Sequence, residues 1–367
     1  MVWSRPPRVV KPVTLWVVHN ILVVNPGSTS TKLSVFADGI STSSDVIRHD
    51  AATLRVCRTL WDQFDLRWQA VHAWAASNAR QLDAIAAMGG LFRPLTGGTY
   101  AVNERMLKDA RANLQGEHAS NLGCALAHRL AGEYGCPAYV VDPVSVDELE
   151  PLARYSGHPA IERRGLSHAL NIHAAARRAA LQLGTPLEES RVIVAHLGGG
   201  ISVAPVKGGR IIDVNDASSD GPFSPERTGG LPLQRFLDLC FSGSYSEHDL
   251  RTLVMGRGGL VAYLGTNSAM EVERRIAAGD DFAREVYQAM AYQISKEIGA
   301  MATVLAGSVH AIVLAGGLAG SAMLVGWIGD RVKFIAPILV YPGEDEMGAM
   351  AQAALRVIRG ETQPLEY

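Results

Sequence analysis

The chain has 367 residues, 48% of them hydrophobic, and its 34 basic and 36 acidic side chains leave a formal net charge of −2. A chain of this length exceeds the size at which one hydrophobic core keeps growing, so we expect two domains, each with its own core. The balanced charge excludes a basic surface for nucleic acid and an acidic tail, which leaves a small molecule as the expected partner.

The N-terminal segment, residues 1–20, combines early basic residues with a short apolar run. His19 and Asn20 interrupt that run, and no cleavage site of small residues follows. We interpret the segment as an N-terminal extension, with a signal peptide as the alternative. No later stretch approaches the roughly 20 apolar residues of a membrane-spanning helix. The four cysteines lack the spacing of a zinc site or a disulfide framework, which favours the reducing cytoplasm.

Strand and helix patterns alternate along the first half, as in layered α/β proteins. Residues 21–36 predict two strands around a polar turn. Helical spacing and apolar runs then predict, in chain order, a helix at 66–80, a strand at 82–90, a helix at 119–135, a strand at 137–144 and a helix at 169–184. Glycine, threonine and proline at 184–186 end the last helix and mark the predicted domain boundary.

The opening pattern returns at 192–214, where an apolar strand enters a glycine-rich turn and a second apolar strand leaves it. Aligning Gly27 with Gly198 superposes the two patterns, which indicates an internal duplication. The second half continues with a predicted helix at 281–307, strands at 310–324 and 332–343, and a final helix. We expect domains at 21–185 and 186–343, a hinge near 184–190, and a C-terminal helix at 344–367 that returns to the first domain.

Both turns are candidate phosphate sites, because successive backbone N–H groups and short hydroxyls form a concave surface suited to phosphate oxygens. The first turn supplies Gly27, Ser28, Thr29, Ser30 and Lys32, and the second supplies Gly198, Gly199 and Gly200. Purely structural turns are the alternative. One such turn in each half favours a nucleotide gripped from both sides, although the P-loop motif is absent. We interpret Gly316 and Gly317 as a close approach to the nucleoside, or alternatively as a tight structural turn.

Eight segments of the chain resemble the butyrate kinases and related short- and branched-chain carboxylic acid kinases. The segments are NPGSTSTK, GGTYAVNERM, EHASNLG, VAHLGGGISV, DGPFSPERTGGLP, GRGGLVAYLGTN, AGGLA and YPGEDEM. The resemblance implies an α/β protein of two duplicated ribonuclease H-like domains, the actin-like ATPase fold, flanking a nucleotide cleft. It also implies ATP/ADP and Mg²⁺ as cofactors, a homo-oligomer, and reversible phosphorylation of a short-chain carboxylate to an acyl phosphate and ADP.

That chemistry suits these residues, because a short-chain carboxylic acid with a pKa of about 4 to 5 is already ionised at neutral pH and needs no general base. Positioning and charge neutralisation then carry an in-line phosphoryl transfer. By the resemblance, Arg227 meets the transferring phosphoryl group, His196 lies near that phosphate, and Asp142 orients neighbouring groups. An exposed salt bridge, a structural histidine and an Asp-Pro turn are the respective alternatives.

The resemblance also places Mg²⁺ at Asn25 and at the acidic run 344–346, with Asp345 or Glu346 favoured over Glu344 as the ligand. Capping of the following helix is the alternative for these carboxylates. His118 corresponds to a second active-site histidine. His168 resembles a largely structural histidine, and we leave it out of the site.

One position departs from the family pattern: Met88 stands where butyrate kinases carry an arginine. Arg93 replaces that charge only if its loop folds back. We hypothesise that Met88 instead widens an apolar wall for a longer or branched acyl chain. Two alternatives stay open: an acetate- or propionate-type kinase, which the HLGGG sequence at 196–200 disfavours, and a nucleotide-binding homologue with impaired catalysis.

Overall fold

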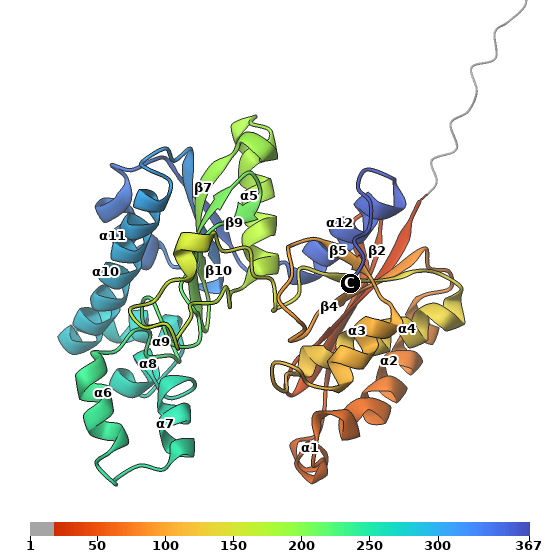
Figure 1. Cartoon of the computed structure of the whole chain (residues 1–367), viewed down its shortest axis with the longest axis horizontal. Helices are drawn as coiled ribbons and strands as arrows, with labels where there is room; N and C mark the ends of the chain where they lie inside the picture. The colour runs from red at the N-terminus through yellow and green to blue at the C-terminus, as the bar shows by residue number, and fades with distance from the viewer. Residues whose placement is uncertain (1–17) are drawn as a thin grey trace, which may run out of the picture.

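The computed structural model describes residues 18–367, which form two α/β lobes side by side (Figure 1). Of the extension predicted for residues 1–20, residues 1–17 lie outside this described part. Within residues 18–367, no helix combines the length and the apolar character needed to cross a membrane.

The first lobe is built on a six-stranded sheet with the strand order β3-β2-β1-β4-β6-β5. Strands β1, β2 and β3 form an antiparallel meander, and β4 and β6 extend the sheet parallel to β1. The strands are β1 (Asn20–Pro26), β2 (Ser30–Ala37), β3 (Ile40–Arg48), β4 (Ala84–Met88), β5 (Thr99–Ala101) and β6 (Ala138–Val141).

Both faces of this sheet are buried, which explains why β1 is a continuous apolar run. Leu22 and Val24 face a core shared with α2 and α4, whereas Ile21 and Val23 face a core shared with α12. The helices of this part are α1 (Ala51–Val56), α2 (Phe64–Asn78), α3 (Glu104–Arg111), α4 (Gly123–Tyr134) and the 3₁₀ turns η1 (Leu60–Gln63), η2 (Ala119–Leu122) and η3 (Pro151–Arg154).

The second lobe repeats the arrangement with the strand order β11-β10-β7-β8-β9. Here β7, β8 and β9 form the antiparallel meander, and β10 and β11 run parallel to β7. The strands are β7 (Arg191–Leu197), β8 (Ile201–Lys207), β9 (Arg210–Ile211), β10 (Ala311–Gly316) and β11 (Ile338–Pro342). The duplicated α/β architecture predicted from the sequence is therefore confirmed.

One face of the second sheet packs on α10 and α11, and the other packs on α5. The helices are α5 (Ala169–Leu183), α6 (Leu233–Cys240), α7 (Glu247–Val254), α8 (Gly259–Leu264), α9 (Ala269–Ala277), α10 (Asp281–Val304), α11 (Ala322–Val332), α12 (Glu346–Ile358) and the 3₁₀ turns η4 (Leu187–Glu189) and η5 (Gly317–Gly320). The strand predicted for 310–324 is thus shorter, because Ser321 caps a helix, α11.

The helices α5 and α12 lie between the two sheets (Figure 1). Helix α12 packs on the first sheet, the lobe to which we expected the C-terminal segment to return. Helix α5 was expected in the first domain, yet Ile172 and Ala176 pack on the second sheet. The chain therefore changes lobes soon after β6, and the hinge predicted at 184–190 falls inside the second lobe. The glycine at 184 ends α5 in a left-handed conformation, so this signal marks a helix end rather than a domain boundary.

Candidate active site

The two predicted phosphate turns occupy equivalent places, each between the first two strands of its lobe. In the first turn, Gly27 N donates to Ser30 O at 2.8 Å, and in the second, Gly198 N donates to Gly200 O at 3.2 Å. Ser28 and Thr29 are exposed at the tip of the first turn, and Gly199 is exposed in the second. Each lobe therefore presents one short turn with an exposed tip, which carries hydroxyl groups only in the first lobe.

A buried arginine on α2 holds the first turn from beneath. Arg67 is fully buried, and its guanidinium donates to Ser28 O at 2.9 Å, to Ser30 O at 3.1 Å and to Thr31 Oγ1 at 3.1 Å. These bonds fix the carbonyls on the inner side of the turn. Arg67 is not recognisable from the sequence, because one arginine among the polar residues of a helix gives no sign that it is buried.

One arginine and two histidines lie beside the second turn. Arg227 packs so closely over Gly200 that a Cβ there would clash with the guanidinium, and Arg227 Nη1 donates to Ala217 O at 2.6 Å. His196 ends β7, and its ring lies 4.4 Å from the ring of His168, centroid to centroid. His168 Nδ1 is 2.8 Å from Ser202 Oγ. His168, which we had left out of the site, thus adjoins two of its predicted members.

Burial keeps both imidazoles neutral near pH 7. It lowers the pKa of His196 to about 4. Burial, and then the nearby His196 and Arg227, lower the pKa of His168 well below its usual value. Within residues 18–367, His196 Nδ1 has no hydrogen-bond partner although it is buried. The cluster therefore offers a guanidinium beside two uncharged imidazole rings.

The acidic run between β11 and α12 connects the two turns. Glu346 Oε2 accepts from Asn25 Nδ2 at 2.8 Å and lies 3.7 Å from Lys32 Nζ, both beside the first turn. Glu344 Oε1 lies 3.7 Å from His196 Nε2 beside the second turn. Asp345 instead caps α12, because its Oδ1 accepts from Gly348 N at 2.9 Å. Of the two favoured carboxylates, the structure brings Glu346 to Asn25, and it gives Asp345 the capping position.

No group of three metal-binding His, Cys, Asp or Glu side chains occurs within residues 18–367. Mg²⁺ does not need such a cage, since it is commonly bound by one or two carboxylates together with substrate phosphates and water. Asn25 and Glu346 supply oxygen donors of this kind beside the first turn. The donor set therefore fits Mg²⁺ better than a metal that requires an all-protein site.

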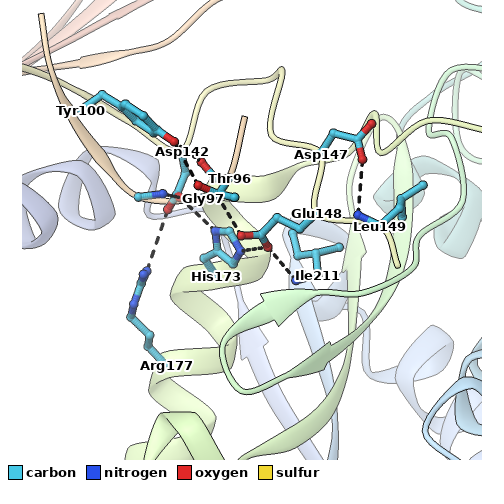
Figure 2. A network of polar contacts seen from close by, with 11 residues as sticks. Thr96, Gly97, Tyr100, Asp142, Asp147, Glu148, Leu149, His173, Arg177 and Ile211 are labelled. Atoms are coloured by element: carbon cyan, nitrogen blue, oxygen red, sulfur yellow. Dashed lines mark hydrogen bonds and ion pairs between the residues drawn. The ribbon is translucent and has the colours of Figure 1, made fainter. Parts of the chain in front are cut away.

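Asp142 belongs to a buried network at the passage between the lobes (Figure 2). Its Oδ1 accepts from Gly98 N at 2.7 Å and lies 2.9 Å from His173 Nδ1. The other ring nitrogen of His173 is 3.2 Å from Glu148 Oε2. None of these partners is another predicted site residue. Asp142 also has a φ of 37°, a left-handed conformation that the surrounding bonds hold in place.

The charges in this network stabilise one another. Burial disfavours protonation of His173, but Asp142 and Glu148 outweigh it and raise the pKa of His173 to about 9. Burial likewise opposes ionisation of Asp142, yet His173 and Arg177 outweigh it and lower the pKa of Asp142. The network is therefore an imidazolium held between two carboxylates.

Comparison with known proteins places these features in a family. The model of the acetokinase family matches residues 153–331. A probable butyrate kinase 2 of Caldanaerobacter subterraneus subsp. tengcongensis is 51% identical over 350 residues, covering 95% of this chain and 99% of that protein. The butyrate kinase 2 of Clostridium acetobutylicum is 46% identical over 351 residues, covering 95% and 99%. The chain belongs to the acetokinase family.

Solved structures show that this acetokinase chain shares its fold with other members. The acetate kinase of Porphyromonas gingivalis matches with a TM-score of 0.75 at 17% identity, over 93% of this chain and 100% of that one. A propionate kinase from Francisella tularensis subsp. tularensis matches with a TM-score of 0.75 at 17% identity, over 91% and 98%. These likenesses confirm the predicted actin-like ATPase fold.

The three remaining predicted positions, Gly316, Gly317 and His118, each lie in a different environment. Gly316 has a φ of 95°, and a side chain there would clash with Leu197 O, whereas the Cβ position of Gly317 is open. The absence of a side chain at Gly316 therefore allows β10 to pack closely against β7. His118 caps η2, with its Nδ1 2.6 Å from Ser120 Oγ.

Met88 is half-buried at the end of β4, where it packs against the core shared with α12. Arg93 is committed elsewhere, since its Nε donates to Asp109 Oδ2 at 2.7 Å. Arg93 therefore does not replace the arginine expected at position 88.

Proposed function

We propose that this protein transfers the γ-phosphoryl group of ATP to a short-chain carboxylate such as butyrate or a branched acid. The products are an acyl phosphate and ADP, and the reaction is reversible. The proposal rests on membership of the acetokinase family and on the near full-length likeness to butyrate kinases. The observation in the structure that supports it best is the acidic run 344–346, which contacts both phosphate turns through Glu344 and Glu346.

Arg227 is the proposed catalytic cation. It lies over Gly200, so a phosphoryl group held by the second turn would sit beside the guanidinium. Charge on the equatorial oxygens of the phosphoryl group is stabilised by such a preorganised donor. The acceptor carboxylate is already ionised, so neither His196 nor His168 has to remove a proton. Each neutral ring keeps one N–H group that can donate a hydrogen bond to a phosphate oxygen.

Asn25 and Glu346 are the residues proposed to hold Mg²⁺. The chemistry that the ion supplies when bound is charge neutralisation between the β- and γ-phosphate oxygens. Lys32 lies 3.7 Å from Glu346 and adds a positive charge at the same turn. Closure of the two lobes on the nucleotide would exclude water from the acyl phosphate. The nucleoside is proposed to lie at the open face of Gly317.

The direct test is an acyl hydroxamate assay with ATP, Mg²⁺, hydroxylamine and a panel of acetate, propionate, butyrate and isobutyrate. We expect product with butyrate and isobutyrate in preference to acetate. A preference for acetate would identify an acetate-type kinase instead. ADP binding without any hydroxamate, for all four acids, would contradict the proposed activity.

A further inference from the structure

Helices α5 and α12 lie between the two sheets (Figure 1). A cavity of about 530 Å³ is lined by residues of both helices. One wall is α5, which packs on the second sheet, and the other is α12, which packs on the first. The lining includes His196 and Glu344, and also Arg177, Arg178 and Arg356, three arginines that the proposed reaction does not use.

These three arginines have few anionic partners. Within residues 18–367, neither Arg178 nor Arg356 forms a side-chain hydrogen bond or an ion pair; Arg178 stacks on Tyr341, with its Cζ 3.9 Å from the ring centroid. Arg177 Nη1 is 3.9 Å from Asp142 Oδ2, but that carboxylate already has His173 as its close partner. Three guanidiniums thus line one cavity together with the carboxylates of Asp142, Glu344 and Asp345. Of these, Asp142 has His173 as its close partner and Asp345 accepts from Gly348 N.

Two of these cations approach each other from opposite lobes. Arg177 belongs to α5 and Arg356 to α12, and both are only partly exposed. Burial, and then the charge of Arg177, lower the pKa of Arg356, while the charges of Asp142 and Glu361 raise it. An anion between the two guanidiniums would contact both lobes at once.

The chemistry of the cluster points to phosphate. Guanidinium groups bind phosphate and carboxylate through paired N–H donors, and several of them around one site favour a ligand with more than one negative charge. We propose that the cavity between α5 and α12 is a second anion site, in which Arg177, Arg178 and Arg356 bind a phosphate group, either free or as a phosphate monoester. Because the walls belong to different lobes, occupancy would favour one spacing of the lobes over others.

Binding can be measured by calorimetry with inorganic phosphate and with glycerol phosphate, in the presence of saturating ADP and Mg²⁺ to fill the nucleotide site. We expect wild-type protein to bind, and we expect the Arg178→Gln and Arg356→Gln variants to bind roughly tenfold to a hundredfold more weakly. Arg235→Gln, an exposed arginine on α6, is the matched control for loss of one charge.

The two probes separate the sources of the phosphate group. Binding of inorganic phosphate alone identifies a free-ion site, and tighter binding of glycerol phosphate identifies a site for phosphate monoesters. The proposal is overturned if wild-type protein binds neither probe, if Arg178→Gln and Arg356→Gln bind as wild type does, or if Arg235→Gln loses as much affinity as they do. Arg178 is exposed, so its variant should fold normally, and circular dichroism of each variant confirms that a loss of binding is not a loss of fold.

Discussion

Glu344 and Glu346 lie two positions apart in the chain, yet they contact different lobes. Glu344 Oε1 is 3.7 Å from His196 Nε2 at the second turn, and Glu346 Oε2 accepts from Asn25 Nδ2 at the first. Between them, Asp345 caps α12 and so fixes the start of the helix, whose first residue is Glu346. The acidic run 344–346 therefore contacts both phosphate turns and continues directly into α12.

The first prediction separates the metal carboxylate from the capping carboxylate. Glu346→Gln keeps an acceptor for Asn25 but removes the charge proposed to bind Mg²⁺. We expect the rate at fixed Mg²⁺ to fall by at least about tenfold, with partial recovery at high Mg²⁺. Asp345→Asn is the control, because Asn caps helices about as well as Asp and should leave the rate near wild type. A larger loss in Asp345→Asn than in Glu346→Gln would reverse the assignment.

The second prediction concerns Arg227. Arg227→Lys keeps the charge but removes the forked donor over Gly200, so we expect kcat to fall by about 10²- to 10³-fold with little change in the melting temperature. Arg93→Lys is the matched control, since Arg93 binds Asp109 on the surface of the first lobe. Equal losses in the two variants, measured by acyl hydroxamate formation, would remove Arg227 from the catalytic role.

The third prediction concerns Arg67, which positions the first turn without touching the substrate. Arg67→Lys cannot span Ser28 O and Thr31 Oγ1 together, so the turn should loosen. We expect KM for ATP to rise several-fold while KM for butyrate stays nearly constant. Parallel changes in both constants, or a change in the melting temperature alone, would indicate a purely structural residue.

The repeated turns were predictable because an apolar strand, a turn of small residues and a second apolar strand recur in both halves. The distinction between Asp345 and Glu346 was not, since it depends on which residue starts α12 by capping it. The assignment of α5 to the second lobe also escaped prediction. Its amphipathic pattern shows that one face is buried but says nothing about which sheet buries it. Arg67 is similar, because its burial depends on the turn that α2 happens to cover.

The fourth prediction uses the pH dependence of stability. His173 has a pKa raised to about 9 in the folded protein, against about 6.5 for an unfolded histidine. A raised pKa stabilises the fold fully below pH 6.5, and this contribution is lost as the pH rises toward 9. Its size is on the order of 3 kcal/mol. Urea unfolding between pH 6.5 and 9 should therefore show decreasing stability.

His173→Gln is the matched variant for that experiment. It removes the titrating group, so the decrease between pH 6.5 and 9 should flatten. The variant should also be less stable than wild type at pH 6.5, because Asp142 and Glu148 lose the charge that balances them. An unchanged pH slope in His173→Gln would mean that other groups, such as the buried cysteines, cause the decrease.

The last prediction tests the departure at position 88. Met88 packs beside α12 at the end of β4, where the family arginine would place a charge near the acceptor. If Met88 forms an apolar wall for the acyl chain, Met88→Arg should lower kcat/KM for butyrate and isobutyrate relative to acetate by about tenfold. This factor corresponds to the one or two methylene groups that a hydrophobic pocket distinguishes. Met88→Leu keeps the wall apolar and should keep the wild-type order of acids. Acyl hydroxamate formation with acetate, butyrate and isobutyrate gives the measurement. If Met88→Arg leaves the rate and the order of acids unchanged, Met88 does not form a wall that determines specificity.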